Sequence, residues 1–435
     1  MLFNSYEFIF VFLPVCLVIF FSASKLNKSL AVIWLVLSSL FFYGWRNVYY
    51  VPLLVASVCI NYFISKKIND GTAKRFWLIL GISTNVTVLC ICKYINVLPL
   101  GISFFTFAQT AYIVNTFKGT AKPEGFLSYA EYVTFFGYIT SGPIADYREM
   151  IPQFRSAGTP DYEMIAQGIT LFALGLFKKV YIADSLASFV NGLFAQAELL
   201  TFFEAWTAAL GYSMHLYFDF SGYSDMAIAV GFMFGLKLPD NFNSPYKSTS
   251  IIDFWRRWHM SLGAWVKEYI YIPLGGSREG DLKRTRNVIL AMLLTGLWHG
   301  LGWTFVLWGM IHGVMLAVNH QWRRLGFRLP AVIAWGVTFT CVVLCWVIFR
   351  AESLGSAVHM LGTMTGLKGF PLEGLRVGSK KLILALTLIT VFTPNTKDIL
   401  RRFRPGILWL VLTLMLFVMA FMNFSGVSDF LYFQF

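Results

Sequence analysis

Long apolar runs, separated by short loops that carry lysine and arginine, recur along the whole chain. A helix needs about 20 predominantly apolar residues to cross the roughly 30 Å hydrocarbon core of a bilayer, and these runs approach that length. Hydrophobic residues make up 57% of the 435 residues and charged residues 13%, whereas soluble domains carry about 25% charged residues. The chain is therefore predicted to be an all-α polytopic membrane protein, without room for a large soluble domain.

We expect a single membrane-embedded domain, residues 1–435, because no internal repeat or linker interrupts this pattern. The apolar runs predict about eleven transmembrane helices. The expected spans are 8–24, 30–46, 48–65, 76–93, 96–116, 129–145, 164–177, 303–320, 331–349, 382–395 and 406–424.

The basic loops predict the orientation of the chain. Cytoplasmic loops of membrane proteins are enriched in lysine and arginine. We therefore expect the loops with Lys25, Lys66, Lys178, Arg284 and Arg323 in the cytoplasm. The net negative loop 146–163 is expected outside, as are both termini; loop 350–381 is also expected outside although it is net basic. The formal net charge of +13 does not indicate nucleic-acid binding, because the basic residues lie in short loops where topology and anionic lipids account for them.

Residues 201–300 break the regular pattern. Polar residues interrupt the apolar runs there, among them Asp219, Asp225 and the turn 239–246. Segment 253–273 is amphipathic, which favours an interfacial or re-entrant helix. Irregular backbone at membrane depth is tolerated only where it is buried in protein or lines a cavity, so we expect the functional site here. The two aspartates would either line a polar cavity or cap helix halves at a break.

One histidine, His299, ends an apolar run in this region. A helix over 287–299, entering from the basic loop 283–286, would rise about 20 Å. It would hold the histidine beyond the midplane of the membrane. An ionisable side chain at that depth is costly and indicates a functional site by default. Histidine is also the most common proton-transfer residue near neutral pH.

A second histidine, His259, shares one feature with His299: each follows a tryptophan, Trp258 and Trp298 respectively. A deep histidine with aromatic walls can act as a general base in a water-poor pocket. The alternative is a packing histidine whose hydrogen bonds are satisfied. His312 lies on the next predicted helix and is either a neighbour that tunes the site or a packing group. The spacings contain no metal-ligand pattern, so we expect no metal.

Taken in order, a series of motifs resembles the membrane-bound O-acyltransferases, in the bacterial branch with the alginate O-acetylase membrane subunit. The resemblance covers nearly the whole chain. The motifs are Leu98-Pro99-Leu100-Gly101-Ile102-Ser103-Phe104-Phe105-Thr106-Phe107, Gly142-Pro143-Ile144, Gly175-Leu176-Phe177-Lys178-Lys179-Val180, Tyr217-Phe218-Asp219-Phe220-Ser221-Gly222-Tyr223-Ser224-Asp225-Met226-Ala227, Phe254-Trp255-Arg256-Arg257-Trp258-His259-Met260-Ser261-Leu262, Tyr271-Ile272-Pro273-Leu274-Gly275-Gly276 and Gly296-Leu297-Trp298-His299-Gly300.

The resemblance implies a helical bundle around a central tunnel in a bacterial inner membrane. It also implies that His299 is the active-site histidine and His259 the second functional histidine, with no tightly bound cofactor. A cytoplasmic donor, usually acetyl-CoA in this branch, would supply an acetyl group for O-acetylation of an exported polysaccharide such as alginate. The expected partners are membrane lipid and an extracytoplasmic SGNH-type acetyltransferase or other polysaccharide-export proteins.

Two further residue sets are expected around the tunnel. A basic set would bind the phosphates of coenzyme A, or would otherwise serve as topology signals and lipid contacts: Arg256, Arg257 and Lys267. A second set would line the substrate tunnel: Trp258, Trp298, Asp219 and Asn241.

The chain departs from the family pattern at two positions and leaves other functions open. Asn115 stands where an aspartate is expected, and His215 stands where a glutamine is expected. One alternative is a relative that exports D-alanine to teichoic acid. Another is a polytopic transporter or scaffold of a polysaccharide export complex.

Overall fold

The computed structural model describes residues 1–95, 97, 99–278, 280–367, 369–370, 377–424 and 431, without the side chains of 377–380 and 382. These residues form α-helices, short 3-10 and π-helices and turns, with no β-strand among them. The all-α prediction is therefore confirmed for this part of the chain. Residues fall into two compact units, one of 1–176, 223–240 and 403–418, and one of 177–222, 241–402 and 419–435. We call them unit 1 and unit 2.

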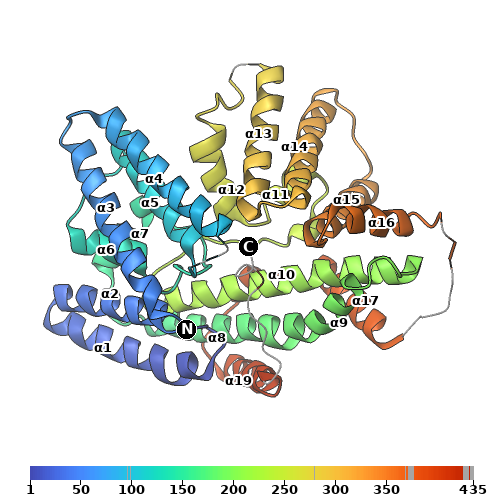
Figure 1. Ribbon diagram of the computed structural model, residues 1–435. Coiled ribbons are helices and arrows are strands. Elements are labelled where there is room, and N and C mark those ends of the chain that lie inside the picture. Colours follow the sequence, from blue (N-terminus) through green and yellow to red (C-terminus); the bar gives the residue numbers. More distant parts are fainter. Residues whose placement is uncertain are drawn as a thin grey trace. The chain divides into compact units, whose positions relative to one another are not determined.

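Unit 1 contains most of the N-terminal helices (Figure 1). Its elements are η1 (Phe8–Phe12), α1 (Leu13–Leu26), α2 (Lys28–Gly44), η2 (Val48–Tyr50), α3 (Val51–Asn69), α4 (Lys74–Tyr94), α5 (Ile102–Phe117), α6 (Phe126–Thr134), α7 (Tyr147–Ser156), α8 (Tyr162–Leu176) and most of α19 (Ile407–Phe421). Helices α1 and α2 form a tight hairpin, because the single residue Asn27 ends one helix and caps the next by accepting a 2.8 Å hydrogen bond from the Ser29 amide.

Helix α5 forms the core of unit 1. The break expected around Pro99 is present: Gly101 has a φ of +72°, and a Cβ there would lie 2.1 Å from the carbonyl oxygen of Ile139. Nearly every α5 side chain is buried. Its polar Gln109 donates a 3.0 Å hydrogen bond to Ser57 of α3, as polar side chains commonly do between membrane helices. Leu98, in the same expected span, lies outside the described residues.

The expected span 129–145 is wrong. Helix α6 ends at Thr134, and the following residues form buried turns rather than helix. The turn requires glycine, because a Cβ at Gly142 would lie 2.5 Å from the Cα of Tyr138. An apolar, aromatic-rich sequence therefore packs inside protein here, where a hydropathy pattern had predicted contact with lipid.

Unit 2 contains the remaining helices. They are η3 (Phe177–Ala183), α9 (Asp184–Phe194), the first two thirds of α10 (Phe202–Met233), η4 (Pro245–Lys247), α11 (Ile251–Trp255), α12 (Met260–Val266), η5 (Lys267–Tyr271), α13 (Asp281–His299), α14 (Trp303–Arg324), α15 (Ala331–Arg350), α16 (Leu354–Met364), α17 (Val377–Phe392) and α18 (Thr396–Leu400). Helices α13 and α14 form an antiparallel hairpin, and α15 packs on α14.

Two sequence expectations are corrected in the region 201–300. Helix α10 is continuous through Asp219 and Asp225, so these aspartates cap no helix break. Helix α13 begins at Asp281, which places the basic residues 283–286 inside the helix and not in a loop. The rise from this basic turn to His299 is still about 20 Å. His299 is therefore still expected beyond the midplane of the membrane.

The apolar helices account for part of the expected membrane crossing. Five described helical segments are long and apolar enough to span a bilayer: Phe8–Leu26, Val48–Asn69, Lys74–Tyr94, Tyr162–Phe194 and Ala331–Arg350. Three shorter apolar helices cover Lys28–Gly44, Ile383–Phe392 and Ile407–Phe421. Segment 253–273 is not a regular span but three short helices, as expected, and the loop 350–381 contains the unexpected helix α16.

Candidate active site around two buried histidines

Two glycines bring α14 close to the end of α13. A Cβ at Gly296 would lie 2.3 Å from the carbonyl oxygen of Phe305, and a Cβ at Gly309 would lie 2.5 Å from that of Met292. Small residues permit such close approach between membrane helices. The hairpin therefore packs α14 against the last turn of α13, which ends at His299.

Aromatic rings surround the imidazole of His299, which is only 3% exposed. The ring of Trp298 lies 4.5 Å away between centroids. Helix α14 adds Trp308 at 5.3 Å, and α15 adds Phe349 at 5.1 Å, both nearly perpendicular to the imidazole. The aromatic wall expected from one tryptophan is thus built from three helices. Such a site excludes water from the imidazole, as a general base in a dry pocket requires.

His259 is held in an unusual backbone conformation. It is the N-cap of α12 and has a φ of +44°, in the left-handed region. A non-glycine residue there costs on the order of 1–3 kcal/mol, and such strain is concentrated at functional sites. The neighbouring loop maintains it: the carbonyl of Asn241 accepts a 2.9 Å hydrogen bond from the Met260 amide. The imidazole is buried and packs on Phe220 at 4.7 Å.

The side chain of Asn241 also sets the protonation pattern of His259. Its Oδ1 lies 3.0 Å from Nδ1 of the imidazole and 2.8 Å from Oγ of Ser261. An amide oxygen only accepts hydrogen bonds, so Nδ1 carries the proton and the neutral ring keeps its lone pair on Nε2. This is the tautomer in which Nε2 can accept a proton from a hydroxyl.

A continuous series of ring contacts connects the two histidines. Trp258, next to His259, lies 4.9 Å from Trp346 of α15. Trp346 in turn lies 6.0 Å from Trp308, which contacts His299. Both histidines therefore belong to one aromatic cluster of unit 2. That they line one cavity remains a prediction.

His312 joins this cluster from α14. Its ring is fully buried, 4.8 Å from Trp308. The indole N–H of Trp255 donates a 3.2 Å hydrogen bond to Nδ1 of His312. Nδ1 is therefore the acceptor, and Nε2 carries the proton of the neutral ring. His312 is thus a neighbour of His299 across one shared tryptophan.

Asp219 lies in a buried ion-pair cluster. The ammonium of Lys179 lies 2.8 Å from its carboxylate and 2.6 Å from that of Asp184, and all three side chains are at most 2% exposed. The other carboxylate oxygen of Asp219 accepts a 3.0 Å hydrogen bond from the Leu431 amide. A buried carboxylate needs such compensation. These contacts account for a charged residue within a continuous helix; its expected tunnel-lining role remains a prediction.

The expected basic set lies on the segment that carries His259. Arg257 pairs with Asp253 at 3.0 Å and lies on the turn after α11, whereas Arg256 and Lys267 are exposed. The exposed pair thus remains accessible to a phosphate. Of the expected tunnel residues, Trp258 is buried in the aromatic cluster and Asn241 positions His259.

Three important residues of the cluster were not found from the sequence: Phe220, Trp346 and Phe349. Trp346 and Phe349 are three residues apart on α15, the spacing that places both on one helix face. That signal was present, but it is equally typical of any buried helix. Their contact with α13 and α14 depends on tertiary packing.

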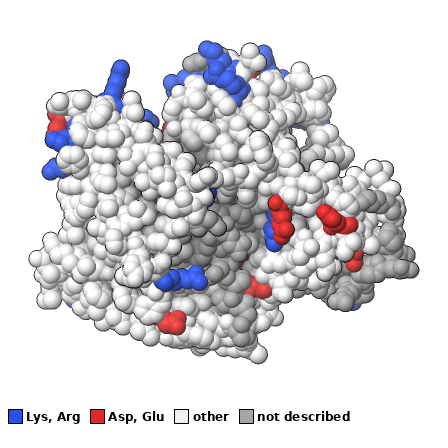
Figure 2. Space-filling view, viewed as in Figure 1, with Lys and Arg blue, Asp and Glu red and all other residues white. Residues whose placement is uncertain are grey.

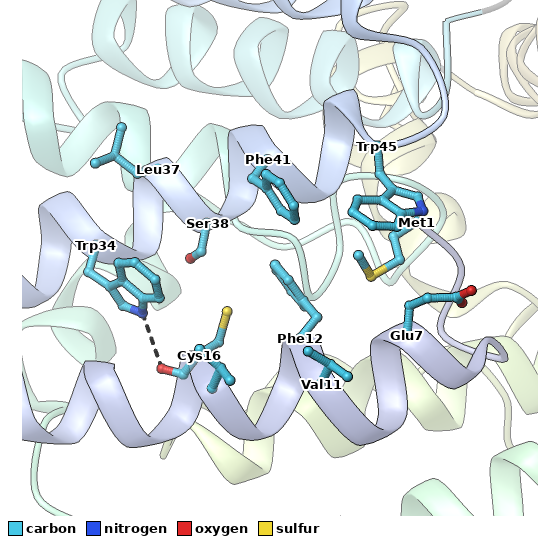
Figure 3. A pocket seen from close by; sticks show the side chains of 11 residues that line it. Met1, Glu7, Val11, Phe12, Cys16, Trp34, Leu37, Ser38, Phe41 and Trp45 are labelled. Carbon is cyan, nitrogen blue, oxygen red and sulfur yellow. Dashed lines mark hydrogen bonds between the residues drawn. The ribbon is translucent and has the colours of Figure 1, made fainter.

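A large apolar groove in unit 1 has different properties (Figure 3). It has a volume of about 510 Å³ and lies between η1–α1 and α2. The indole N–H of Trp34 is engaged with the Cys16 carbonyl at 3.2 Å. Glu7 is the one charged side chain among its lining residues, and no histidine is among them. The groove suits hydrocarbon, and none of its lining residues is a histidine that could take the role of His299.

The fold and the site together define a multi-pass helical membrane protein with buried histidines suited to proton transfer. Residues 100–349 match the membrane-bound O-acyltransferase family, and this range contains both histidines. The chain belongs to that family, and it is an O-acyltransferase.

Similar proteins act on different polymers, according to their names. A peptidoglycan O-acetyltransferase of Helicobacter pylori is 44% identical over 427 residues, covering 86% of this chain and 81% of that protein. A probable alginate O-acetylase of Pseudomonas putida is 34% identical over 100% of both chains. A teichoic acid D-alanyltransferase of Bacillus subtilis is 31% identical over 58% of this chain and 69% of that protein. The expected family and enzyme class are confirmed, as is multi-pass membrane location in a bacterial family.

Proposed function

We propose that this enzyme transfers acetyl groups from cytoplasmic acetyl-CoA, through a tunnel between about eleven spans, for O-acetylation of an extracytoplasmic glycan. The single observation that carries the proposal is the burial of His299 among three aromatic rings at the end of α13. A base placed there meets an acceptor hydroxyl away from bulk water. Both termini would lie outside the bacterial inner membrane.

The chemistry requires one proton transfer in each direction. A histidine takes the proton of the acceptor hydroxyl while its oxygen attacks the thioester carbonyl. The tetrahedral intermediate then collapses, the C–S bond breaks, and the thiolate of coenzyme A receives the proton. The exposed Arg256 and Lys267 would bind the phosphates of coenzyme A.

We propose that the acceptor polymer is a glycan. The relatives that align over most of the chain are named for O-acetylation of peptidoglycan or alginate, whereas the D-alanyltransferase relatives match little more than half of it. This difference supports an acetyl donor over a D-alanyl donor. An extracytoplasmic SGNH-type acetyltransferase would complete the transfer to the polymer.

Acetyl analysis of a strain that lacks the gene tests this proposal. Base-labile acetate is measured on peptidoglycan and on exported polysaccharide of the parent, the deletion strain and the complemented strain. We expect one glycan to lose its acetyl esters in the deletion strain and to regain them on complementation. Unchanged acetate on both glycans, or loss of D-alanine esters instead, would contradict the proposal.

A further inference from the structure

Two buried N–H groups near His299 lack a hydrogen-bond partner. They are the indole Nε1–H of Trp308 and the imidazole Nε2–H of His312, and neither atom has a partner among the residues that the structure describes. Both side chains are at most 1% exposed. Buried N–H groups without a partner are rare, because each has given up its hydrogen bonds to water on folding. Such groups need an explanation, and a role in catalysis is one.

The protonation pattern of His312 makes its Nε2 a donor. The indole N–H of Trp255 donates a 3.2 Å hydrogen bond to Nδ1, so the neutral ring keeps its proton on Nε2. Trp255 is the last residue of α11, which packs on α14. The two nitrogens of an imidazole point in diverging directions. The tautomer of His312 is therefore fixed from one side, and the N–H is presented on the other.

Both donors lie on the part of α14 that contacts the active-site histidine. Trp308 and His312 are four residues apart, a spacing that places side chains on one face of a helix. Their ring centroids lie 4.8 Å apart. The ring of Trp308 also lies 5.3 Å from the imidazole of His299. The base and the two donors are therefore joined by direct ring contacts.

The surroundings of the donors favour a neutral acceptor over an anion. The rings around Trp308 are aromatic or imidazole and carry no fixed charge. Basic side chains gather instead at the uppermost end of α13 in Figure 2, and Arg323 lies about three turns beyond His312 on α14, a rise of about 16 Å. Phosphates are typically bound by charged donors. A carbonyl oxygen has two lone pairs, so it suits two neutral N–H groups.

We propose that the Nε1–H of Trp308 and the Nε2–H of His312 hold the carbonyl oxygen of the acyl donor during transfer. This inference rests on the proposed function and names the groups that stabilise its transition state. As the acceptor oxygen attacks the carbonyl carbon, the π electron pair of the C=O bond moves to the carbonyl oxygen. That oxygen becomes negatively charged and is stabilised by both donors. A neutral imidazole can serve as such a donor.

The two donors keep their own protons throughout the reaction. When the electron pair returns, the C=O bond forms again and the C–S bond breaks. His299 carries the proton of the acceptor hydroxyl to the leaving thiolate. Trp308 and His312 therefore act by hydrogen bonding alone, so a substitute that keeps the N–H should keep the effect.

Three variants of His312 separate donation from packing. His312→Gln can place an amide N–H near the position of Nε2 but has no acceptor at the position of Nδ1. His312→Asn keeps an acceptor for Trp255 and lacks the donor, and His312→Phe has neither. The control is His320→Asn, at a half-buried histidine of the same helix outside the aromatic cluster.

Trp308 can be tested without loss of ring volume. It is replaced with 3-benzothienylalanine, in which a sulfur atom stands in place of the indole N–H. The same replacement at Trp322, which lies on α14 and is 40% exposed, is the control.

Rate and stability are measured on the same variants. Each is expressed in a strain that lacks the chromosomal gene, and the initial rate at which acyl esters appear on the glycan is determined per amount of protein. Acetate and D-alanine esters are counted separately. The melting temperature of each purified full-length protein in detergent reports its stability.

We expect His312→Asn, His312→Phe and the benzothienyl replacement of Trp308 to lower the rate by about 10²–10³, the effect of removing one oxyanion donor. His312→Gln should stay at least about tenfold faster than His312→Asn, although it leaves the Trp255 donor unpaired. Both controls should keep the parental rate. Rates that follow the melting temperatures, with His312→Asn faster than His312→Gln, would overturn the proposal. So would a parental rate after the replacement of Trp308.

The ester counts distinguish failure of this inference from failure of the proposed function. If the deletion strain loses D-alanine esters and the variants keep the expected order, the proposed acetyl donor is wrong and the inference holds. If it loses acetate and the rates follow the melting temperatures, the proposed function holds and the inference fails. Unchanged esters of both kinds would contradict both.

Discussion

His299 and His259 reach their buried positions by different local means. His299 is the last helical residue of α13, followed by the extended Gly300. His259 has a left-handed backbone conformation that the Asn241 loop maintains. The first position depends on helix packing, and the second depends on a strained turn. We therefore expect mutations in the helix hairpin and in the loop to affect the two histidines separately.

His312 offers a test of the aromatic cluster at the residue scale. His312→Phe removes the acceptor of the Trp255 indole N–H, and an unpaired buried donor costs about 1–3 kcal/mol. His312→Asn keeps an acceptor near the position of Nδ1. Thermal unfolding in detergent should therefore show a larger loss of stability for His312→Phe than for His312→Asn. Equal losses in both variants would show that the hydrogen bond contributes nothing.

At the scale of elements, the hairpin of α13 and α14 determines where His299 lies. Its glycines allow backbone contact that no larger residue permits. The same requirement for close packing explains why only part of the site could be predicted. The tryptophan–histidine pairs were visible in the sequence, but the contribution of α15 requires knowledge of which helices pack together.

Adding a methyl group at the hairpin tests this requirement. In Gly296→Ala the new Cβ would lie 2.3 Å from the Phe305 carbonyl oxygen, so the helices must separate. Overpacking of this kind costs about 1–3 kcal/mol, and a shift of about 1 Å at a catalytic group can reduce the rate about a hundredfold. Stability and acetyl transfer should both fall. Gly336→Ala on α15, where no atom lies within 4 Å, should leave both unchanged; similar losses in the two variants would contradict the account.

Glu131 of helix α6 should make the free energy of unfolding depend on pH. Burial raises the pKa of the Glu131 carboxyl from 4.5 to about 8. Lys28 and Arg155 face the same small pocket, but Lys28 is bonded to the Arg155 carbonyl and Arg155 is paired with Glu124. The folded state thus binds the proton more tightly than the unfolded state, so stability falls as the pH rises from about 4.5 towards 8.

Glu131→Gln mimics the protonated carboxyl and should remove that fall. Thermal unfolding of parent and variant would be similar at pH 5, and the variant would be the more stable protein at pH 8. A difference between them that is the same at both pH values would contradict the assignment.

At the scale of the whole molecule, the hydropathy pattern predicted well where the helices lie. It predicted less well which segments contact lipid and which are buried in protein. Two predictions were wrong for the same reason: a membrane span over 129–145, and a helix break at Asp219. The turns after α6 are buried inside the protein, and Asp219 is paired with Lys179, so in both places other parts of the protein provide the compensating contacts. A pattern read along one segment cannot contain those partners. The orientation of the chain in the membrane is still predicted from the basic loops alone. Residues 432–435, which are expected outside, lie beyond the described part of the chain.

Orientation can be measured with two matched threonines. Thr72 and Thr159 are both exposed and lie outside the helices. Thr72 lies between the basic residues Lys67 and Lys74, and Thr159 lies in the net negative loop 146–163. In a background without the six native cysteines, Thr159→Cys should react with an impermeant maleimide in intact cells. Thr72→Cys should react only after permeabilisation. The opposite pattern would show that the predicted orientation is inverted.

Acetyl transfer by His299→Ala tests the central claim most directly. A general base contributes about 10²–10⁴ in rate, so the variant should lose at least about a hundredfold at unchanged expression and fold. His320→Ala, a half-buried histidine of α14 outside the aromatic cluster, is the matched control and should keep the parental rate. Near-parental transfer by His299→Ala would contradict the assignment of this histidine as the catalytic base.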